Sequence, residues 1–264
     1  MSSLCRGDEL SSVPSVSAVF RVDGIDIECH LAGAPDDGLN NHGLVIAHGF
    51  PSLRRPMSAF GETYPHLADR LAADTGWSVL SVSFRGTGNS GGDFSLGGWL
   101  ADLRGALSYL RDVPGINDVW VAGFGTGGSL GLCAAAEDEL VRGVASFGSP
   151  ADFHDWAAQP EECLERARGA GAVRSKNFPP NFDEWALELA DIKPDIVIGK
   201  IAPRPIMIVH GAEDDVVSPV DARVLAQAGG GEVELRVLGG AGHDLRHDPR
   251  AVALLMGWLD RQSA

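Results

Sequence analysis

The 264-residue sequence has few cysteines, few basic side chains and no long apolar run. Its four cysteines are scattered without a C-x-x-C spacing, which excludes a zinc or disulfide framework pattern and is typical of a reducing compartment. Only 21 lysines and arginines stand against 36 aspartates and glutamates, and a net charge of −15 repels nucleic acid and anionic membrane surfaces. The N-terminus lacks the basic and apolar segments of a signal peptide, and no apolar run could span a bilayer. We therefore expect a cytoplasmic protein with no nucleic-acid or membrane partner.

What the sequence does contain is a regular alternation of strand and helix patterns. Val16–Arg21 and Ile25–Leu31 predict a hairpin with the turn Asp23-Gly24. The alternation that follows predicts a mostly parallel, doubly wound α/β sheet with helices on both faces. The later predicted strands are Leu44–His48, Ser78–Phe84, Asp118–Ala122, Val141–Phe147, Pro205–Val209 and Glu232–Leu238; the predicted helices are Tyr64–Asp74, Leu96–Arg111, Gly127–Glu137, Val220–Ala228 and Arg250–Arg261.

Residues 150–200 interrupt the alternation with two weakly helical pieces and with aromatic residues such as Trp156, Trp185 and Phe178. Long insertions in compact domains are commonly functional lids. We therefore predict a single domain, residues 1–264, in which residues 150–200 form a small helical cap over the strand ends. A plain surface excursion is the alternative.

Candidate site residues follow several of the predicted strands, at the edge of the sheet where ligands bind in such folds. After the Leu44 strand, the segment His48-Gly49-Phe50 offers backbone N–H groups that can hold a developing oxyanion. His48 itself is expected to be a structural, hydrogen-bonding histidine. The glycine-dense loop at 83–92 lacks the Gly-Lys-Ser/Thr ending of a P-loop, so a tight structural loop is expected there.

The two last strands are followed by an acid and a histidine. Asp214, with Asp215 as the adjacent and less favoured choice, comes shortly after the Pro205–Val209 strand. His243 comes directly after the final strand. A carboxylate at such a position can orient a histidine and stabilise its imidazolium, and the chain order of these groups makes the set specific.

The segment Gly123-Phe124-Gly125-Thr126-Gly127 has the frame of a nucleophile elbow, Gly-x-Ser-x-Gly, with glycine in the place of serine. Together with the segments above, it resembles the α/β-hydrolase superfamily, and within it small bacterial esterase- and dipeptidyl-peptidase-like hydrolases. The resemblance covers nearly the whole chain and implies an α/β-hydrolase fold. It also implies that Gly125 holds the nucleophile position.

By the same resemblance, Asp214 would be the triad acid and His243 the base. The backbone N–H groups of Phe50 and Thr126 would form the oxyanion hole. The implied partner is a small ester- or amide-like ligand, with no cofactor and no metal, whereas the oligomeric state is not indicated. Because glycine has no side chain, ordinary acyl-enzyme hydrolysis is not expected.

Several readings of Gly125 remain open. Thr126 could attack instead, although the elbow directs only its apex residue toward the base. The spacing Gly123-x-Gly125-x-x-Gly128 matches a dinucleotide fingerprint, but such a motif belongs on the first strand–helix turn of its fold.

Two further readings concern the whole protein. An Asp214–His243 dyad could act as a general base without a covalent nucleophile, or the chain could be a non-catalytic ligand-binding homologue. Glycine relaxes the backbone strain at the apex of a nucleophile elbow. A serine lost in nature and a serine replaced by glycine in the laboratory would give the same sequence.

Overall fold

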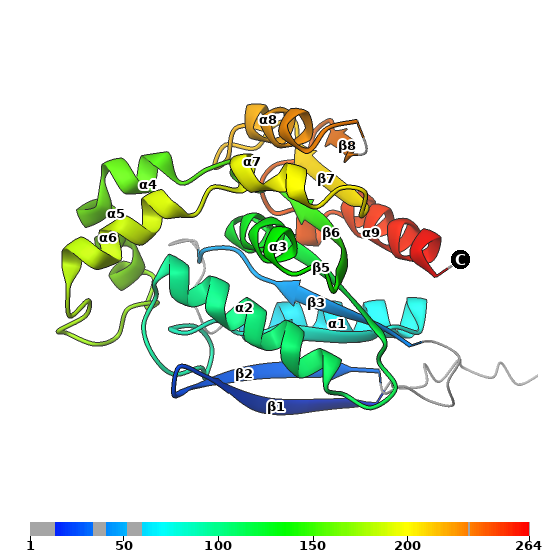
Figure 1. The fold of residues 1–264 in the computed structure, drawn as a ribbon, viewed down its shortest axis with the longest axis horizontal. Coiled ribbons are helices and arrows are strands. Elements are labelled where there is room, and N and C mark those ends of the chain that lie inside the picture. Colours follow the sequence, from blue (N-terminus) through cyan, green and yellow to red (C-terminus); the bar gives the residue numbers. More distant parts are fainter. Residues whose placement is uncertain (1–13, 34–40, 52–59, 232, 264) are drawn as a thin grey trace, which may run out of the picture.

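An eight-stranded sheet forms the centre of the protein in the computed structural model, which describes residues 14–33, 41–51, 60–231 and 233–263 (Figure 1). The strands are β1 (Ser15–Val22), β2 (Ile25–Ala32), β3 (His42–Ala47), β4 (Ser78–Val82), β5 (Asp118–Phe124), β6 (Val141–Phe147), β7 (Ile206–Gly211) and β8 (Val233–Leu238). Their order is β1-β2-β4-β3-β5-β6-β7-β8. The pairs β1–β2 and β2–β4 are antiparallel and the others are parallel. This confirms the predicted hairpin and mostly parallel sheet.

Helices cover both faces of the sheet, as predicted. The helices between and after the strands are α1 (Phe60–Thr75), α2 (Leu96–Arg111), α3 (Thr126–Glu137), α8 (Pro219–Gly229) and α9 (Pro249–Gln262). One face is covered by α1 and α9, which contact each other, and the opposite face by α2, α3 and α8 (Figure 1). The helix α2 begins where the sequence predicts because the Ser95 hydroxyl accepts a hydrogen bond from the Gly98 N–H.

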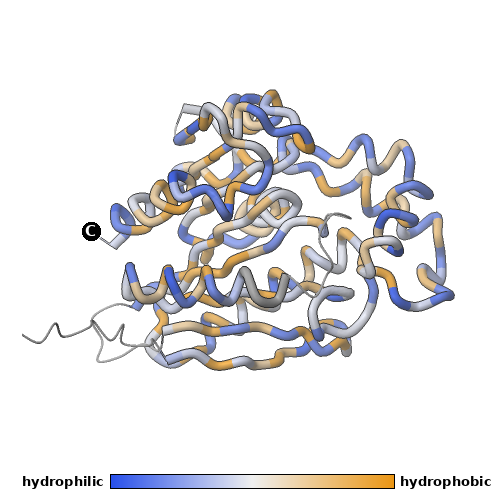
Figure 2. The backbone as a smooth tube through the Cα atoms, turned by 180° about the vertical axis from the view of Figure 1, so that it is seen from behind, coloured by the Kyte–Doolittle hydropathy of each residue, from blue (hydrophilic) through white to orange (hydrophobic). Residues whose placement is uncertain are grey.

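Two apolar clusters lie on either side of the sheet. The α1–α9 side contains Leu67 and Leu71, which lie four residues apart in α1 and are both buried. The α2–α3 side contains Leu103 and Leu107. Figure 2 shows that hydrophobic residues concentrate along the inner strands, whereas the surrounding helices alternate between polar and apolar positions. Strands buried on both faces therefore appear as continuous apolar runs in the sequence.

The differences from the predicted elements are confined to their ends and to the insertion. The helix predicted from Tyr64 begins at Phe60, and β5 continues two residues beyond Ala122. Glu232, predicted to open the last strand, lies outside the described residues, as does the N-terminal segment judged to lack a signal peptide. No helix in the described part of the chain is long and apolar enough to cross a membrane.

The insertion at residues 150–200 contains more helices than the two predicted pieces. They are α4 (His154–Ala158), α5 (Pro160–Gly169), α6 (Phe182–Asp191), α7 (Pro194–Val197) and the 3-10 turn η2 (Ile198–Lys200). The shortest of these are below the length at which a helical period can be recognised in a sequence. Figure 1 shows α4, α5 and α6 together at one end of the sheet, on the left of the view.

The glycine-dense loop after β4 anchors this insertion to the sheet. The Arg174 guanidinium, between α5 and α6, donates hydrogen bonds to the carbonyl oxygens of Gly86 at 3.0 Å, Gly88 at 2.9 Å and Ser90 at 3.3 Å. The Asp93 carboxylate accepts a bond from the backbone N–H of Arg174 at 2.5 Å. The loop therefore has a structural role, in agreement with its sequence-based interpretation.

Candidate active site

The turn between β5 and α3 places Gly125 at its apex. Gly125 has φ 53° and ψ −126°, a backbone conformation that is strained for a residue with a Cβ. Its N–H donates to the Phe147 carbonyl of the neighbouring strand at 2.8 Å. At Gly127 an added Cβ would overlap the backbone of Ala47 and His48, so α3 begins in direct contact with the end of β3. The turn thus has the sharp strand-to-helix geometry that a nucleophile elbow requires.

His243 and Asp214 lie together beside this turn, although 29 residues separate them in the chain. The His243 Nδ1 atom is 2.9 Å from Asp214 Oδ2. A Cβ built on Gly125 would lie 3.6 Å from His243 Nε2 and 3.5 Å from the α-carbon of Gly49, the nearest other atom. Both are ordinary van der Waals distances, so the position has room for a side chain and faces the free nitrogen of His243.

Asp214, and not Asp215, makes the contact with His243. The Asp214 side chain is fully buried, whereas Asp215 is exposed. The second oxygen of Asp214, Oδ1, accepts hydrogen bonds from the backbone N–H groups of Val216 and Val217, each at 2.9 Å. This arrangement selects between the two acids that the sequence left open.

The hydrogen bonds to Asp214 keep it ionised. Burial of the carboxylate raises its pKa, but bonds donated by the side chains of His210 and His243 and by the Val217 N–H outweigh burial, so the pKa of Asp214 lies well below its usual range. The negative charge of Asp214 is therefore present throughout the pH range in which a histidine base would operate.

This low pKa predicts a specific loss of stability in acid. The folded chain holds Asp214 deprotonated at a pH where the unfolded chain binds a proton. The contribution of Asp214 to the free energy of unfolding is therefore complete above the unfolded pKa of about 3.9, and it is lost as the pH falls below that value. Urea unfolding between pH 6 and pH 3 should show a steeper decline for the native chain than for Asp214→Asn. Parallel declines would contradict the ionised, hydrogen-bonded carboxylate, because all other carboxylates contribute equally to both curves.

The two backbone groups predicted for an oxyanion hole flank Gly125. Phe50 follows Gly49, whose α-carbon lies 3.5 Å from the Cβ position of Gly125. Thr126 is the first residue of α3, where backbone N–H groups have no partner within the helix. The Phe50 ring packs at 5.0 Å, between ring centroids, against Trp156 of α4, so the insertion lies over this loop. The roles of these residues in an oxyanion hole and of the insertion as a lid remain predictions.

His48 has the structural role that its sequence context predicts. Its Nε2 atom accepts a hydrogen bond from the Phe84 N–H at 3.1 Å, and its Nδ1 atom lies 2.8 Å from the Gly49 carbonyl oxygen, to which it donates. Burial lowers the pKa of His48 to about 4. The neutral ring joins the ends of β3 and β4.

The glycine spacing that matches a dinucleotide fingerprint has a packing explanation. An added Cβ at Gly123 would overlap the backbone of Gly127 and Gly128, and one at Gly128 would overlap the Ser149 hydroxyl.

In the described part of the chain, no group of three or more His, Cys, Asp or Glu side chains could hold a metal ion.

A second histidine beside the acid was missed in the sequence. His210, the penultimate residue of β7, is fully buried, and its Nε2 atom lies 3.2 Å from Asp214 Oδ2. The available signal was its position at the end of an apolar strand, four residues before Asp214. It went unused because single histidines in such runs are mostly structural.

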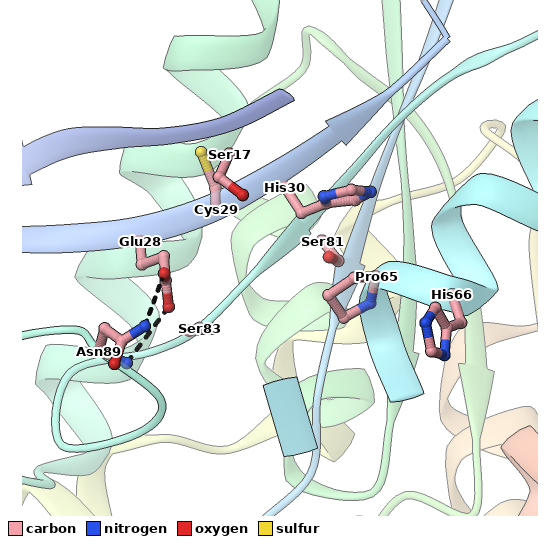
Figure 3. A pocket seen from close by; sticks show the side chains of 9 residues that line it. All are labelled: Ser17, Glu28, Cys29, His30, Pro65, His66, Ser81, Ser83 and Asn89. Carbon is pink, nitrogen blue, oxygen red and sulfur yellow. Dashed lines mark hydrogen bonds between the residues drawn. The ribbon is translucent and has the colours of Figure 1, made fainter. Parts of the chain in front are cut away.

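A cavity of about 340 Å³ lies elsewhere, against β1, β2, β4 and the α1 helix (Figure 3). Its lining includes Glu28, His30, His66 and Asn89, and the Glu28 and Asn89 side chains hydrogen-bond to each other at 2.9 Å. None of the residues predicted for the site lines this cavity, so it is not part of the candidate active site.

The sequence that folds into this sheet also matches a known family. A family model described as the alpha/beta hydrolase family matches residues 44–254. The chain belongs to the alpha/beta hydrolase family. No curated protein is matched by sequence.

Several solved structures have the same fold at low sequence identity. A hypothetical protein, PA2218, from Pseudomonas aeruginosa is 18% identical with a TM-score of 0.73, over 99% of each chain. The Pyrococcus furiosus esterase Pf2001 is 17% identical with a TM-score of 0.71, over 100% of this chain and 98% of that chain. Est1E from Butyrivibrio proteoclasticus is 17% identical with a TM-score of 0.71, over 93% and 98%. These likenesses establish the α/β-hydrolase fold.

Proposed function

We propose that this member of the alpha/beta hydrolase family works without a covalent nucleophile, with the Asp214–His243 dyad as a general base. The observation that supports this proposal is the open position at Gly125. A Cβ placed there would lie 3.6 Å from His243 Nε2, while His243 Nδ1 is bonded to Asp214. The His243 side chain is 29% exposed, so a ligand can reach it.

In the proposed reaction, water takes the place of the serine hydroxyl. Because Nδ1–H donates to Asp214, the lone pair of His243 is on Nε2 and faces Gly125. A water molecule there transfers a proton to Nε2 while its oxygen attacks an ester or amide carbonyl carbon. The backbone N–H groups of Phe50 and Thr126 would donate to the resulting oxyanion. His243 then returns the proton to the leaving alcohol or amine, and no bond to the protein forms.

The same dyad could remove a proton from a substrate that carries its own nucleophile or an acidic C–H group. Both versions need a small ester-, amide- or carbonyl-containing ligand beneath the insertion. The aromatic rings of Phe50, Phe94 and Trp156 meet at centroid distances of 5.0 to 6.1 Å and support an apolar ligand surface. A cytoplasmic location remains part of this proposal.

The direct test is hydrolysis of p-nitrophenyl acetate by the native chain and by His243→Ala. Removing a general base should lower kcat by about 10²-fold or more, since that is the usual contribution of such a group. The matched control is His66→Ala, which removes an exposed histidine and should leave the rate unchanged. Mass spectrometry of the native chain during turnover should show no acyl adduct.

Equal rates for the native chain and His243→Ala would overturn the catalytic proposal. A covalent adduct on Thr126 would replace it with a threonine nucleophile. Binding of an ester without His243-dependent turnover would instead support a non-catalytic ligand-binding homologue.

A further inference from the structure

A second histidine contacts the acid of the dyad from its buried side. The His210 Nε2 atom is 3.2 Å from Asp214 Oδ2 and 3.1 Å from the Val217 carbonyl oxygen. Neither oxygen carries a proton when Asp214 is ionised, so Nε2 must carry it and donate toward both. The Nδ1 atom has no hydrogen-bond partner among the described residues. The polar contacts of the His210 ring are therefore made through Nε2.

The two histidines share a single oxygen of Asp214. His243 Nδ1 approaches Oδ2 at 2.9 Å and His210 Nε2 approaches it at 3.2 Å. The other oxygen, Oδ1, is held by the backbone N–H groups of Val216 and Val217. With both oxygens held, the carboxylate cannot rotate without breaking a bond, and Oδ2 stays directed at His243.

The loop that carries Asp214 is also joined to the segment that carries His243. The Ala212 N–H donates to the Leu238 carbonyl and the Glu213 N–H to the Ala241 carbonyl, both at 2.9 Å. His210 lies at the start of this loop, fully buried. It therefore contacts the acid from the rigid end of β7, where its own position is fixed.

We propose that His210 is a positioning residue of the dyad, which fixes Asp214 Oδ2 toward His243 and takes up part of its negative charge. A donor that shares the charge of Oδ2 weakens the attraction between that oxygen and a protonated His243. Loss of this donor should therefore strengthen the attraction between Asp214 and a protonated His243. The inference rests on the proposed role of His243, but its test does not require turnover.

The test compares His210→Leu, which removes the donor, with His210→Gln, whose amide nitrogen can reach the position of Nε2. NMR titration of the His243 ring follows its protonation in each folded variant. We expect His210→Leu to raise the midpoint of this titration by about one pH unit, as for the loss of one hydrogen bond to a charged group. His210→Gln should remain close to the native chain. Any pH profile of turnover should shift in the same direction.

Among the residues that the structure describes, the charged groups that face His210 are Asp214 and, from α8, Asp221. An Asp221→Asn variant therefore shows how far a change in distant charge alone shifts the midpoint of the His243 titration. This shift should be smaller than the shift caused by His210→Leu. Asp102→Asn, which alters a buried ion pair away from the dyad, provides a destabilised control in which the His243 titration stays at the native midpoint.

Several results would overturn the inference. One is a His210→Leu variant that loses stability while the His243 titration keeps its native midpoint, which would make His210 purely structural. Another is the absence of a proton on Nε2 of His210 in the native chain, which ¹⁵N spectra report without any substitution. Failure of the native chain to hydrolyse esters would defeat the proposed function and leave both NMR results decisive for His210.

Discussion

Gly125→Ser is expected to convert the chain into an enzyme that forms an acyl-enzyme. The Cβ position at Gly125 lies 3.6 Å from His243 Nε2, so a hydroxyl one bond further on is within hydrogen-bond reach of that nitrogen. Removal of the serine from a working triad lowers kcat by factors on the order of 10⁶. We expect the reverse change to raise kcat for p-nitrophenyl acetate on the order of 10³-fold or more, with an initial burst and labelling by a fluorophosphonate probe.

The controls separate the hydroxyl from the backbone change. Gly125→Ala adds a Cβ at φ 53° without a nucleophile, and should lose about 1–3 kcal/mol of unfolding free energy with no gain in rate. Gly125→Ser combined with His243→Ala should keep the same backbone and lose the burst. A folded Gly125→Ser variant that neither reacts with the probe nor gains activity would show that the Asp214–His243 pair is not aligned with the elbow.

Asp102→Ala is expected to destabilise the fold more than any other single charge removal among the described residues. Asp102 is fully buried and accepts bonds from the Arg85 guanidinium, at 2.7 and 3.1 Å, and from the Arg85 N–H at 2.8 Å. Asp102→Ala leaves the largely buried Arg85 charge with only the exposed Asp23 carboxylate as a partner, and the expected loss in urea unfolding is about 3 kcal/mol. Arg85 also holds Asp23 of the β1–β2 turn, so this loss should extend to the hairpin.

Two variants check this mechanism. Asp102→Leu combined with Arg85→Met removes both charges and should recover much of the stability, although the backbone N–H at position 85 still lacks an acceptor. Asp26→Ala breaks a surface pair with Arg21 and should leave unfolding nearly unchanged. If Asp102→Ala lowered the free energy of unfolding as little as Asp26→Ala, the buried Asp102–Arg85 pair would not be important for stability.

Most of the fold could be predicted from the sequence because its buried strands and long helices have strong periodic patterns. The helix Leu96–Arg111 and the strand Val141–Phe147 have the predicted bounds. The short helices of the insertion could not be predicted, since a segment such as Pro194–Val197 completes barely one turn. Their positions depend on tertiary contacts, such as the bond from the Trp185 indole N–H to the Phe94 carbonyl.

The members of the candidate site could be found in the sequence, whereas their connections could not. Strand ends that meet at one edge of a parallel sheet predict that Gly125, Asp214 and His243 lie near one another. The choice between Asp214 and Asp215 depends on which carboxylate the loop turns inward. The contact from His210 depends on the same loop folding back over β7. Neither feature has a periodic signal.

The bonds from Arg174 to the loop after β4 have a consequence for how quickly ligands can exchange. They fix the link between α5 and α6 to the body of the sheet, so the insertion has no free end about which it could open as a hinge. We therefore expect the insertion to adapt to a ligand by rotation of individual rings, such as the paired rings of Trp156 and Phe50. Such rotations are far faster than the opening of a domain-sized lid, and we expect the residence time of a ligand to be set by the ligand's own contacts.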